Sequence, residues 1–299
     1  MKCRVLTRNP GVPEAPLDGA CCHGRVTPGR RTRIAIATAP NLRDLGGRPT
    51  VAGGHVRPAT VYRSGELSRL EGEDLATFGE LGIDTVYDLR TAAEVAHRPD
   101  VLPDGHRPVH LDVLGDARHA APAELQRIFE DPSLADEFFR EGQAERYFEA
   151  SYRSFVTLPS ARTAYRRLLE GIAEADGPVL FHCATGKDRT GWITAVLFHL
   201  LGVPADEVLA EYLLTNVDLL PAVQPWMDRF AAGGGDPDLL MPILGVQESY
   251  LAAALDQVKE SHGTVEDYAR DGLGLSPATI DALHERLVDP DPVAPDAQP

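Results

Sequence analysis

The stretch from Val179 to Gly191 constrains the fold of this 299-residue chain more than any other part of it. It reads as an apolar strand, a short polar loop and the first turn of a helix. Five residues separate Cys183 from Arg189, and a loop of this length can curl until its backbone N–H groups and the guanidinium point at one tetrahedral anion. The sequence therefore predicts a phosphate-binding loop with a thiol beneath it, made by Ala184, Thr185, Gly186, Lys187, Asp188 and Arg189.

Strand-like and helical patterns alternate along the chain around this loop. The runs that read as strands are residues 34–36, 60–64, 83–89, 109–113 and 179–182. Helical spacing covers residues 68–82, 160–175, 190–201, 247–262 and 277–288, and a further helix opens at Pro204. Ser68 and Glu71 read as a capping box for the first of these helices.

An aromatic and acidic segment, residues 122–157, is predicted to be a helical insertion. It can be an ordinary packed helix pair or a lid over the site.

One domain spanning residues 34–288 is predicted, because no Pro/Gly/Ser-rich linker interrupts the middle of the chain. Residues 1–33 carry seven Lys and Arg against two acids and show no helical periodicity, so we expect a disordered basic tail. The Asp- and Pro-rich residues 289–299 are predicted to form a second disordered tail.

Composition excludes several classes of protein. The net charge of −16 argues against nucleic-acid binding, because an acidic surface repels the phosphate backbone. No apolar run approaches the roughly 18 residues of a spanning helix, so we expect no stable membrane insertion. Cys183 is the only cysteine outside the N-terminal tail, which favours a reducing, cytoplasmic location over a disulfide framework. The adjacent Cys21 and Cys22 lack zinc-site spacing, and no metal or cofactor is predicted.

The residues of the loop suit nucleophilic chemistry at phosphorus. Convergent N–H groups, the positive end of the following helix and two cations would stabilise Cys183 as a thiolate. Such an anion can attack phosphorus in line, expel an alcohol and leave a phosphocysteine that water hydrolyses. Arg189 offers a planar fork that can hold two phosphate oxygens into the transition state.

Supporting roles fall to neighbouring residues. Thr190 can donate its hydroxyl to the sulfur, and His182 can order the loop by hydrogen bonding. The leaving oxygen needs a general acid, for which Asp188, inside the loop, is the first candidate and Asp88, at the end of a separate strand, is the second. Asp188 could instead hydrogen-bond the loop backbone.

These residues resemble the signature of the cysteine-dependent tyrosine and dual-specificity phosphatases. The His-Cys-x-x-Gly-Lys-Asp-Arg-Thr-Gly motif, preceded by Asn-x-Arg-Asp-x-Gly-Gly, Tyr-Arg-Ser-Gly and Tyr-Asp-Leu-Arg, is most similar to a bacterial branch that also acts on phosphoinositides. The resemblance implies an α/β fold with a central, mainly parallel sheet flanked by helices, a helical C-terminal part, and metal-independent catalysis. It implies that Cys183 is the nucleophile and Arg189 the phosphate binder. No Trp-Pro-Asp loop is present, so the resemblance leaves the general acid open.

The predicted activity is therefore that of a phosphomonoester phosphatase, with phosphotyrosine proteins as the first substrate class. A small-molecule phosphatase, acting on a phosphoinositide, a nucleotide or a biosynthetic intermediate, is the alternative, because the loop recognises phosphate and not its carrier. A non-catalytic phosphate-binding module is a third possibility, which the intact Cys183, Asp188 and Arg189 disfavour. Asp44 and Arg90 are predicted to help recognise the substrate, and the sequence predicts no oligomeric state.

Overall fold

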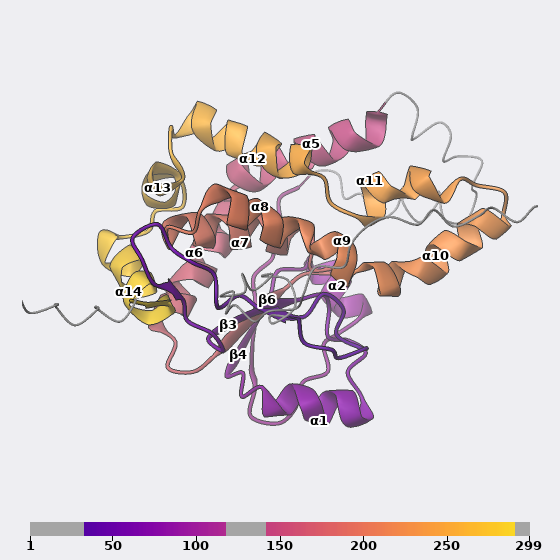
Figure 1. Ribbon diagram of the computed structural model, residues 1–299, viewed down its shortest axis with the longest axis horizontal. Helices are drawn as coiled ribbons and strands as arrows, with labels where there is room; N and C mark the ends of the chain where they lie inside the picture. The colour runs from indigo at the N-terminus through magenta and orange to yellow at the C-terminus, as the bar shows by residue number, and fades with distance from the viewer. Residues whose placement is uncertain (1–32, 118–141, 291–299) are drawn as a thin grey trace, which may run out of the picture.

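The predicted α/β fold is confirmed by a computed structural model, which describes residues 33–117 and 142–290 (Figure 1). A five-stranded sheet has the order β1-β3-β6-β4-β5, and a small second sheet pairs β2 with β7. The strands are β1 (Arg43–Asp44), β2 (His55–Val56), β3 (Val61–Ser64), β4 (Thr85–Asp88), β5 (Arg107–His110), β6 (Val179–His182) and β7 (Val288–Asp289).

The central sheet is parallel except at β1, which runs antiparallel to β3. Its register aligns the last residues of three strands, because His182 of β6 lies opposite Ser64 of β3 on one side and opposite Asp88 of β4 on the other. The loops that leave these strands consequently meet at one edge of the sheet, where ligands bind in open α/β folds.

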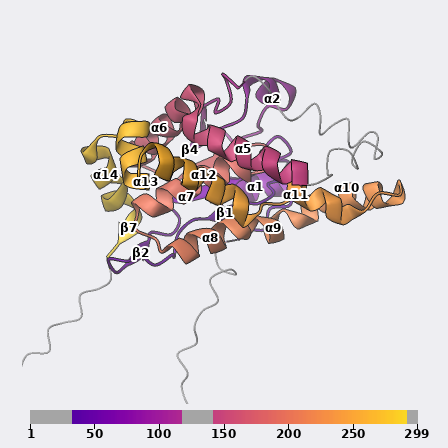
Figure 2. The same cartoon turned by 90° about the horizontal axis from the view of Figure 1, so that it is seen from above.

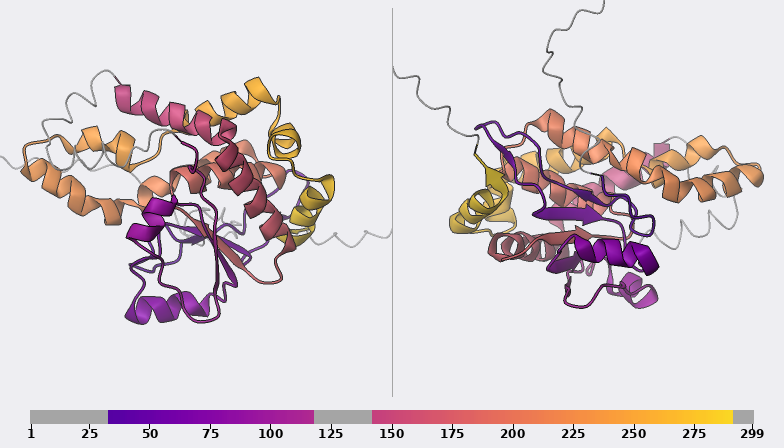
Figure 3. Two further views of the ribbon diagram at one scale, coloured as in Figure 1. Left: turned by 180° about the vertical axis from the view of Figure 1, so that it is seen from behind. Right: turned by 60° about the horizontal axis from the view of Figure 1, so that its bottom comes forward.

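Side chains alternate along the strands and build a core on each face of the sheet. Tyr62, Val86 and Leu180 belong to the core that also contains Phe78 of α1. Phe181 and Tyr87 belong to the larger core, to which α5, α6, α7, α8, α12 and α14 contribute. In Figure 1, α1 accordingly lies below the strands while α5, α7, α8 and α12 lie above them, and the rear view in Figure 3 shows the same separation.

The helices follow the strands in the order expected of an α/β chain and then continue as a helical C-terminal part. Seen from above in Figure 2, α10 and α11 extend away from the body on the side opposite α14. The α-helices are α1 (Gly72–Glu80), α2 (Ala92–His97), α5 (Gln143–Thr157), α6 (Pro159–Glu174), α7 (Asp188–Leu200), α8 (Ala205–Leu213), α9 (Thr215–Asp218), α10 (Leu220–Ala232), α11 (Met241–Leu244), α12 (Glu248–Ser261), α13 (Val265–Asp267) and α14 (Pro277–Leu287).

Two local predictions near the N-terminus are wrong. The capping box proposed at Ser68 does not form, since α1 begins at Gly72 with Glu71 as its N-cap and has no side-chain cap. The run 34–36 forms no strand, because its apolar side chains pack into the core on the α1 face while its backbone turns.

The predicted insertion is described only in its second half. That half is α5, an amphipathic helix with five buried residues that packs against α12 and α6. Residues 118–141 lie outside the described part, as do residues 1–32 and 291–299 of the two predicted tails. Strand β7 includes Asp289, the first residue that we assigned to the C-terminal tail. None of the described helices is both long enough and apolar enough to cross a membrane.

Candidate active site

The predicted loop lies between the end of β6 and the start of α7, and its carbonyl groups are held by the surrounding scaffold. The Ala184 carbonyl accepts a hydrogen bond from the Glu66 amide at 3.1 Å. The Asn41 side-chain amide donates to the Thr185 and Gly186 carbonyls at 3.2 and 2.9 Å. Three successive carbonyls are thereby bonded to the surrounding scaffold.

The amide groups of the same loop are left for a ligand. Within the described residues, no amide N–H from Ala184 to Thr190 donates a hydrogen bond. The last three belong to the first turn of α7, whose N–H groups have no partner inside the helix and mark its positive end. A set of N–H donors around one helix terminus is an anion site.

Gly186 allows the loop to pass close to β3. Its φ of 68° lies in the left-handed region, and a Cβ there would lie 2.3 Å from the Ser64 carbonyl oxygen. Arg63 also donates to the Gly186 carbonyl from the interior. The tight curl of the loop therefore depends on a glycine at this position.

Cys183 is an unpaired thiol, 1% exposed, at the base of this loop. The neighbouring His182 fixes the backbone there, since its Nδ1 donates to the Cys183 carbonyl at 3.2 Å and its Nε2 lies 3.0 Å from Asp100. Burial lowers the pKa of His182, but the hydrogen bond and charge of Asp100 outweigh it and raise the pKa. A protonated imidazole can donate from Nδ1 to the Cys183 carbonyl while its charge attracts Asp100 beside Nε2, and these contacts support the ordering role proposed for His182.

Arg189 is clamped by a residue that the sequence analysis missed. Its Nη1 and Nη2 donate to the two carboxylate oxygens of Glu94 at 2.7 and 2.9 Å, and Nη1 also reaches the Leu89 carbonyl at 3.4 Å. Of the five N–H groups of the guanidinium, those on Nε and one on Nη2 have no partner within the described residues. These two lie on one edge of the planar group and form a fork that suits a phosphate.

Glu94 is itself fixed by the first turn of α2. It forms a capping box with Thr91, whose side chain accepts from the Glu94 amide while the Glu94 carboxylate accepts from the Thr91 amide. Burial alone would raise the pKa of Glu94, but the hydrogen bonds and charge of Arg189 dominate and lower it to about 2. The Thr-x-x-Glu pattern was a readable signal for this cap, but nothing in it indicated Arg189 as the partner.

The described contacts of the Asp188 carboxylate are with two side chains. Its Oδ1 accepts from the Tyr152 hydroxyl at 3.1 Å, and its Oδ2 lies 3.3 Å from the Lys187 ammonium. The alternative role that we considered, hydrogen bonding to the loop backbone, is not what the described contacts show. Tyr152 was also missed by the sequence analysis.

Lys187 has a different role from the one predicted for its side chain. Its ammonium donates to the Gly245 carbonyl at 3.0 Å and lies 4.4 Å from the centre of the Phe148 ring. The residue is 5% exposed, and its side chain joins the loop to α5 and to the turn after α11. Its backbone N–H is among the loop amides that have no partner within the described residues.

Thr190 directly follows Arg189 in the chain. It is fully buried in the first turn of α7, and its hydroxyl is a buried group without a partner among the described residues. Buried hydroxyl groups are normally bonded, so this donor fits a transient acceptor such as the sulfur of Cys183.

Asp88 and Arg90 bond to each other, which corrects two of the predicted roles. Arg90 is fully buried, and its Nη2 lies 2.7 Å from Asp88 and 2.9 Å from Asp100. Burial acts to raise the pKa of Asp88, but the hydrogen bonds from Arg90 and the charge of His182 lower it overall, so Asp88 stays ionised and is poorly suited to be a general acid. Asp88, Asp100 and His182 bring one ligand atom each within 4.8 Å of the others, but the Arg90 guanidinium occupies the position beside both carboxylates.

Asp44 lies away from the site, which corrects its predicted role. It pairs with Tyr62 towards the start of β3, whereas the loop lies beyond the end of that strand. Its carboxylate accepts from the Gly46 and Ala59 amides at 2.9 and 2.7 Å and so shapes a turn.

A buried ionic group supports the loop from below. Glu211 of α8 is 1% exposed and accepts from Arg43 at 2.6 Å and from Arg63 at 2.9 Å, and Arg63 in turn holds Gly186. The attraction of both guanidinium groups lowers the pKa of Glu211 against the opposing effect of burial. The chain thus uses a buried carboxylate to hold two arginines beneath the loop.

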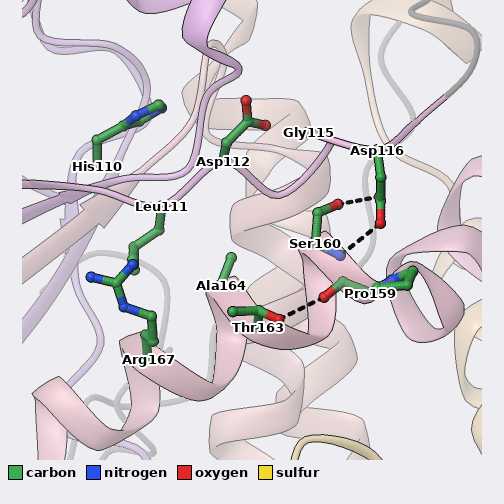
Figure 4. Close-up of a pocket in the computed structure, with 10 residues that line it drawn as sticks. All are labelled: His110, Leu111, Asp112, Gly115, Asp116, Pro159, Ser160, Thr163, Ala164 and Arg167. Atoms are coloured by element: carbon green, nitrogen blue, oxygen red, sulfur yellow. Dashed lines mark hydrogen bonds between the residues drawn. The ribbon is translucent and has the colours of Figure 1, made fainter.

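A surface pocket of about 360 Å³ lies elsewhere, between the segment after β5 and the start of α6 (Figure 4). His110, Asp112, Ser160 and Arg167 are among its lining residues. No residue of the phosphate loop lines it, so it is separate from the site described above.

The comparison with known families agrees with this geometry. Residues 34–289 match the model of a family described as the tyrosine phosphatase family. The chain belongs to the tyrosine phosphatase family. The triple specificity protein phosphatase PtpB of Mycobacterium tuberculosis is 35% identical to this phosphatase over 273 residues, which cover 83% of the chain and 96% of the relative. A putative tyrosine-protein phosphatase of Cupriavidus necator is 31% identical over 276 residues, covering 92% and 94%, and a tyrosine-protein phosphatase of Nostoc commune is 29% identical over 238 residues, covering 77% and 75%.

Two predictions are thereby confirmed. The protein is a bacterial-type phosphatase of the tyrosine and dual-specificity branch, and it is a phosphomonoester hydrolase of the protein-tyrosine-phosphatase type. Its substrate is a phosphorylated molecule. The phosphocysteine reaction is the norm in this family.

Proposed function

We propose that this phosphatase hydrolyses phosphotyrosine in proteins, and phosphoserine and phosphothreonine as well, with Cys183 as the nucleophile. The observation that carries the assignment of the site is the orientation of the loop. The carbonyls of Ala184, Thr185 and Gly186 are bonded to the scaffold, and the amides from Ala184 to Thr190, next to the thiol in sequence, have no partner within the described part of the chain. Such donors hold the three phosphate oxygens and stabilise the negative charge that the transition state spreads over them.

Each residue of the site has a step in the reaction. The Cys183 thiolate attacks phosphorus while the bond to the leaving oxygen breaks, and Asp188 protonates that oxygen. The free fork of Arg189 binds two phosphate oxygens throughout. Asp188 then accepts a proton from water as water attacks the phosphocysteine, and the Thr190 hydroxyl donates to the departing sulfur. Inorganic phosphate is released, and the thiolate is regenerated.

Turnover of para-nitrophenyl phosphate in excess chelator tests the chemistry. We expect turnover by the wild type and a loss of at least about 10³-fold in Cys183→Ser, because an alcohol is far less ionised than a thiol. A rapid denaturing quench followed by mass spectrometry should find one phosphate on the peptide that contains Cys183. Undiminished turnover in Cys183→Ser would refute the covalent mechanism.

A substrate panel tests the choice of substrate. Phosphotyrosine, phosphoserine and phosphothreonine peptides, soluble phosphoinositides and nucleotides are compared by kcat/KM. The names of the relatives support a protein substrate, and the M. tuberculosis relative is named for triple specificity. A kcat/KM for a phosphoinositide or a nucleotide well above that for every peptide would replace the proposed substrate by a small molecule.

Since Cys183 must remain a reduced thiol, we propose the cytoplasm as the location, which cell fractionation tests.

A further inference from the structure

Two buried tyrosines form a hydrogen-bonded line that ends on Asp188. Tyr152 of α5 is fully buried, and its hydroxyl lies 3.1 Å from Asp188 Oδ1 and 2.6 Å from the hydroxyl of Tyr212 on α8. The two rings meet nearly edge to face, at 84°. The line therefore connects two helices from different parts of the sequence to one carboxylate oxygen.

The direction of the hydrogen bonds follows from the chemistry of the groups. A carboxylate only accepts, so Tyr152 donates its single proton to Asp188 and the Tyr212 hydroxyl donates to the Tyr152 oxygen. Burial, followed by the nearby Tyr212 and Asp188, raises the pKa of Tyr152 far above the ordinary range. Tyr152 therefore remains a donor at any pH at which the enzyme works, and the donation from Tyr212 strengthens it.

We propose that Tyr152, supported by Tyr212, is a positioning residue that presents Asp188 as the general acid and leaves Oδ2 as the oxygen that carries the proton. The proposal rests on the role of Asp188 assigned under the proposed function. Because Oδ1 is occupied by the Tyr152 hydroxyl, a protonated Asp188 holds its proton on Oδ2. Lys187, 3.3 Å from Oδ2, stabilises the carboxylate once that proton has left.

The proton balance of both steps uses this arrangement. In the first step a sulfur–phosphorus bond forms, the phosphorus–oxygen bond to the leaving group breaks, and the proton moves from Oδ2 to the leaving oxygen. In the second step the proton returns to Oδ2 from the attacking water as the sulfur–phosphorus bond breaks. The bond from Tyr152 to Oδ1 is kept in both, so the carboxyl group does not need to rotate between them.

Aryl phosphates with different leaving groups provide the test. A general acid matters for a poor leaving group such as phenol, but little for a good one such as 2,4-dinitrophenol, because the latter departs without a proton. We expect Tyr152→Phe to lower kcat/KM for phenyl phosphate by about tenfold and to leave 2,4-dinitrophenyl phosphate within about twofold. Tyr212→Phe keeps the bond to Asp188 and should cause a smaller change in the same direction.

Tyr250→Phe is the matched control. Tyr250 is also fully buried, its ring lies 5.8 Å from that of Tyr152, and its hydroxyl donates to the Pro242 carbonyl instead of to Asp188. This variant should affect both substrates equally. Thermal melts of all variants report whether packing is kept.

Asp188→Asn separates this proposal from the one on which it rests. Suppose that Asp188→Asn lowers kcat/KM for phenyl phosphate selectively, whereas Tyr152→Phe lowers kcat/KM for both substrates equally or for neither. Asp188 is then the acid, and the role of Tyr152 is overturned. If Asp188→Asn shows no leaving-group selectivity, the assignment of the acid fails and the role of Tyr152 fails with it. Selective loss in both variants, with no selectivity in Tyr250→Phe, supports both proposals.

Discussion

Glu94 and Arg189 form a two-point ion pair, with the Arg189 Nη1 and Nη2 atoms 2.7 and 2.9 Å from the two carboxylate oxygens of Glu94. The pair joins α2 to the first turn of α7, across 95 residues of sequence. Burial lowers the pKa of Arg189, but the hydrogen bonds to Glu94 and the nearby negative charges of Cys183 and the carboxylates raise it overall. The guanidinium is therefore permanently charged. The orientation of the phosphate-binding fork is thus set from outside the loop.

Replacing Glu94 by glutamine should weaken catalysis. A glutamine side chain offers one acceptor oxygen, so it can hold only one of the two Arg189 nitrogens and leaves the fork less well oriented. We expect kcat/KM for para-nitrophenyl phosphate to fall by about tenfold, and the KM for phosphate esters to rise. Glu73→Gln, at an exposed acid in the first turn of α1, is the control and should be neutral. Equal kinetics for the two variants would contradict this role of Glu94.

The same ion pair predicts how stability depends on pH. The pKa of Glu94 is lowered to about 2 in the folded protein, because the bonds from Arg189 dominate over burial. The contribution of the ionised Glu94 to the free energy of unfolding is fully present above the ordinary glutamate pKa of about 4.3. It is lost as the pH falls through the folded-state pKa of about 2. Urea unfolding from about pH 5 down to pH 2 should show the wild type losing up to about 3 kcal/mol more than Glu94→Gln. Parallel losses of stability in the two proteins would argue against a contribution of the Glu94–Arg189 pair.

Removing the charge of Glu211 should destabilise the fold. Its carboxylate is the acceptor shared by the buried Arg43 and Arg63, so Glu211→Gln removes the charged partner of Arg63 and leaves Arg43 with the longer, 3.5 Å contact to Asp218. Breaking a buried pair in this way costs about 3 to 5 kcal/mol. Glu207→Gln is the comparison, because that residue pairs with Arg48 at 3.1 Å in a partly exposed position and should cost less than about 1 kcal/mol. Urea denaturation measures the free energy of unfolding of both variants. Similar losses would refute the distinction between the buried and the partly exposed ion pair.

A methyl group at Gly186 should disrupt the loop without unfolding the protein. In Gly186→Ala the new Cβ would lie 2.3 Å from the Ser64 carbonyl oxygen, at a φ of 68°. We expect a loss of about 100-fold or more in kcat/KM, since the phosphate donors would be displaced. Gly82→Ala has nearly the same φ, 65°, with no atom within 4 Å of its Cβ. That control should cost about 1 kcal/mol of stability and leave kcat/KM unchanged.

The local structure around Cys183 could be predicted because it depends on neighbours in sequence. The apolar run of β6, the spacing from Cys183 to Arg189 and the amphipathic pattern of α7 together place the thiol and the guanidinium at the two ends of one loop. Asn41 was within a recognised motif, but its contacts with the Thr185 and Gly186 carbonyls could not be foreseen.

The charged residues outside the loop were less predictable, because a charge carries no information about its partner. Asp88 ends a strand beside the loop and Arg90 follows it, yet Arg90 pairs with Asp88 and Asp100 in the interior. Glu94 was not singled out from the sequence, and Tyr152 was one aromatic residue among many in its segment. Each acquires its role through contacts made across the parallel sheet or between helices.

The sequence by itself determined the two main reacting groups of this phosphatase, the thiol of Cys183 and the guanidinium of Arg189, and the length of the loop between them. Short-range geometry decides these, since strand, loop and helix follow one another without a break. Only the tertiary structure decided which groups orient them, with Glu94 on Arg189, Tyr152 on Asp188 and Arg63 on Gly186. Parallel strands need long crossover connections, so residues that meet at the edge of the sheet are distant in sequence and are brought together by packing alone.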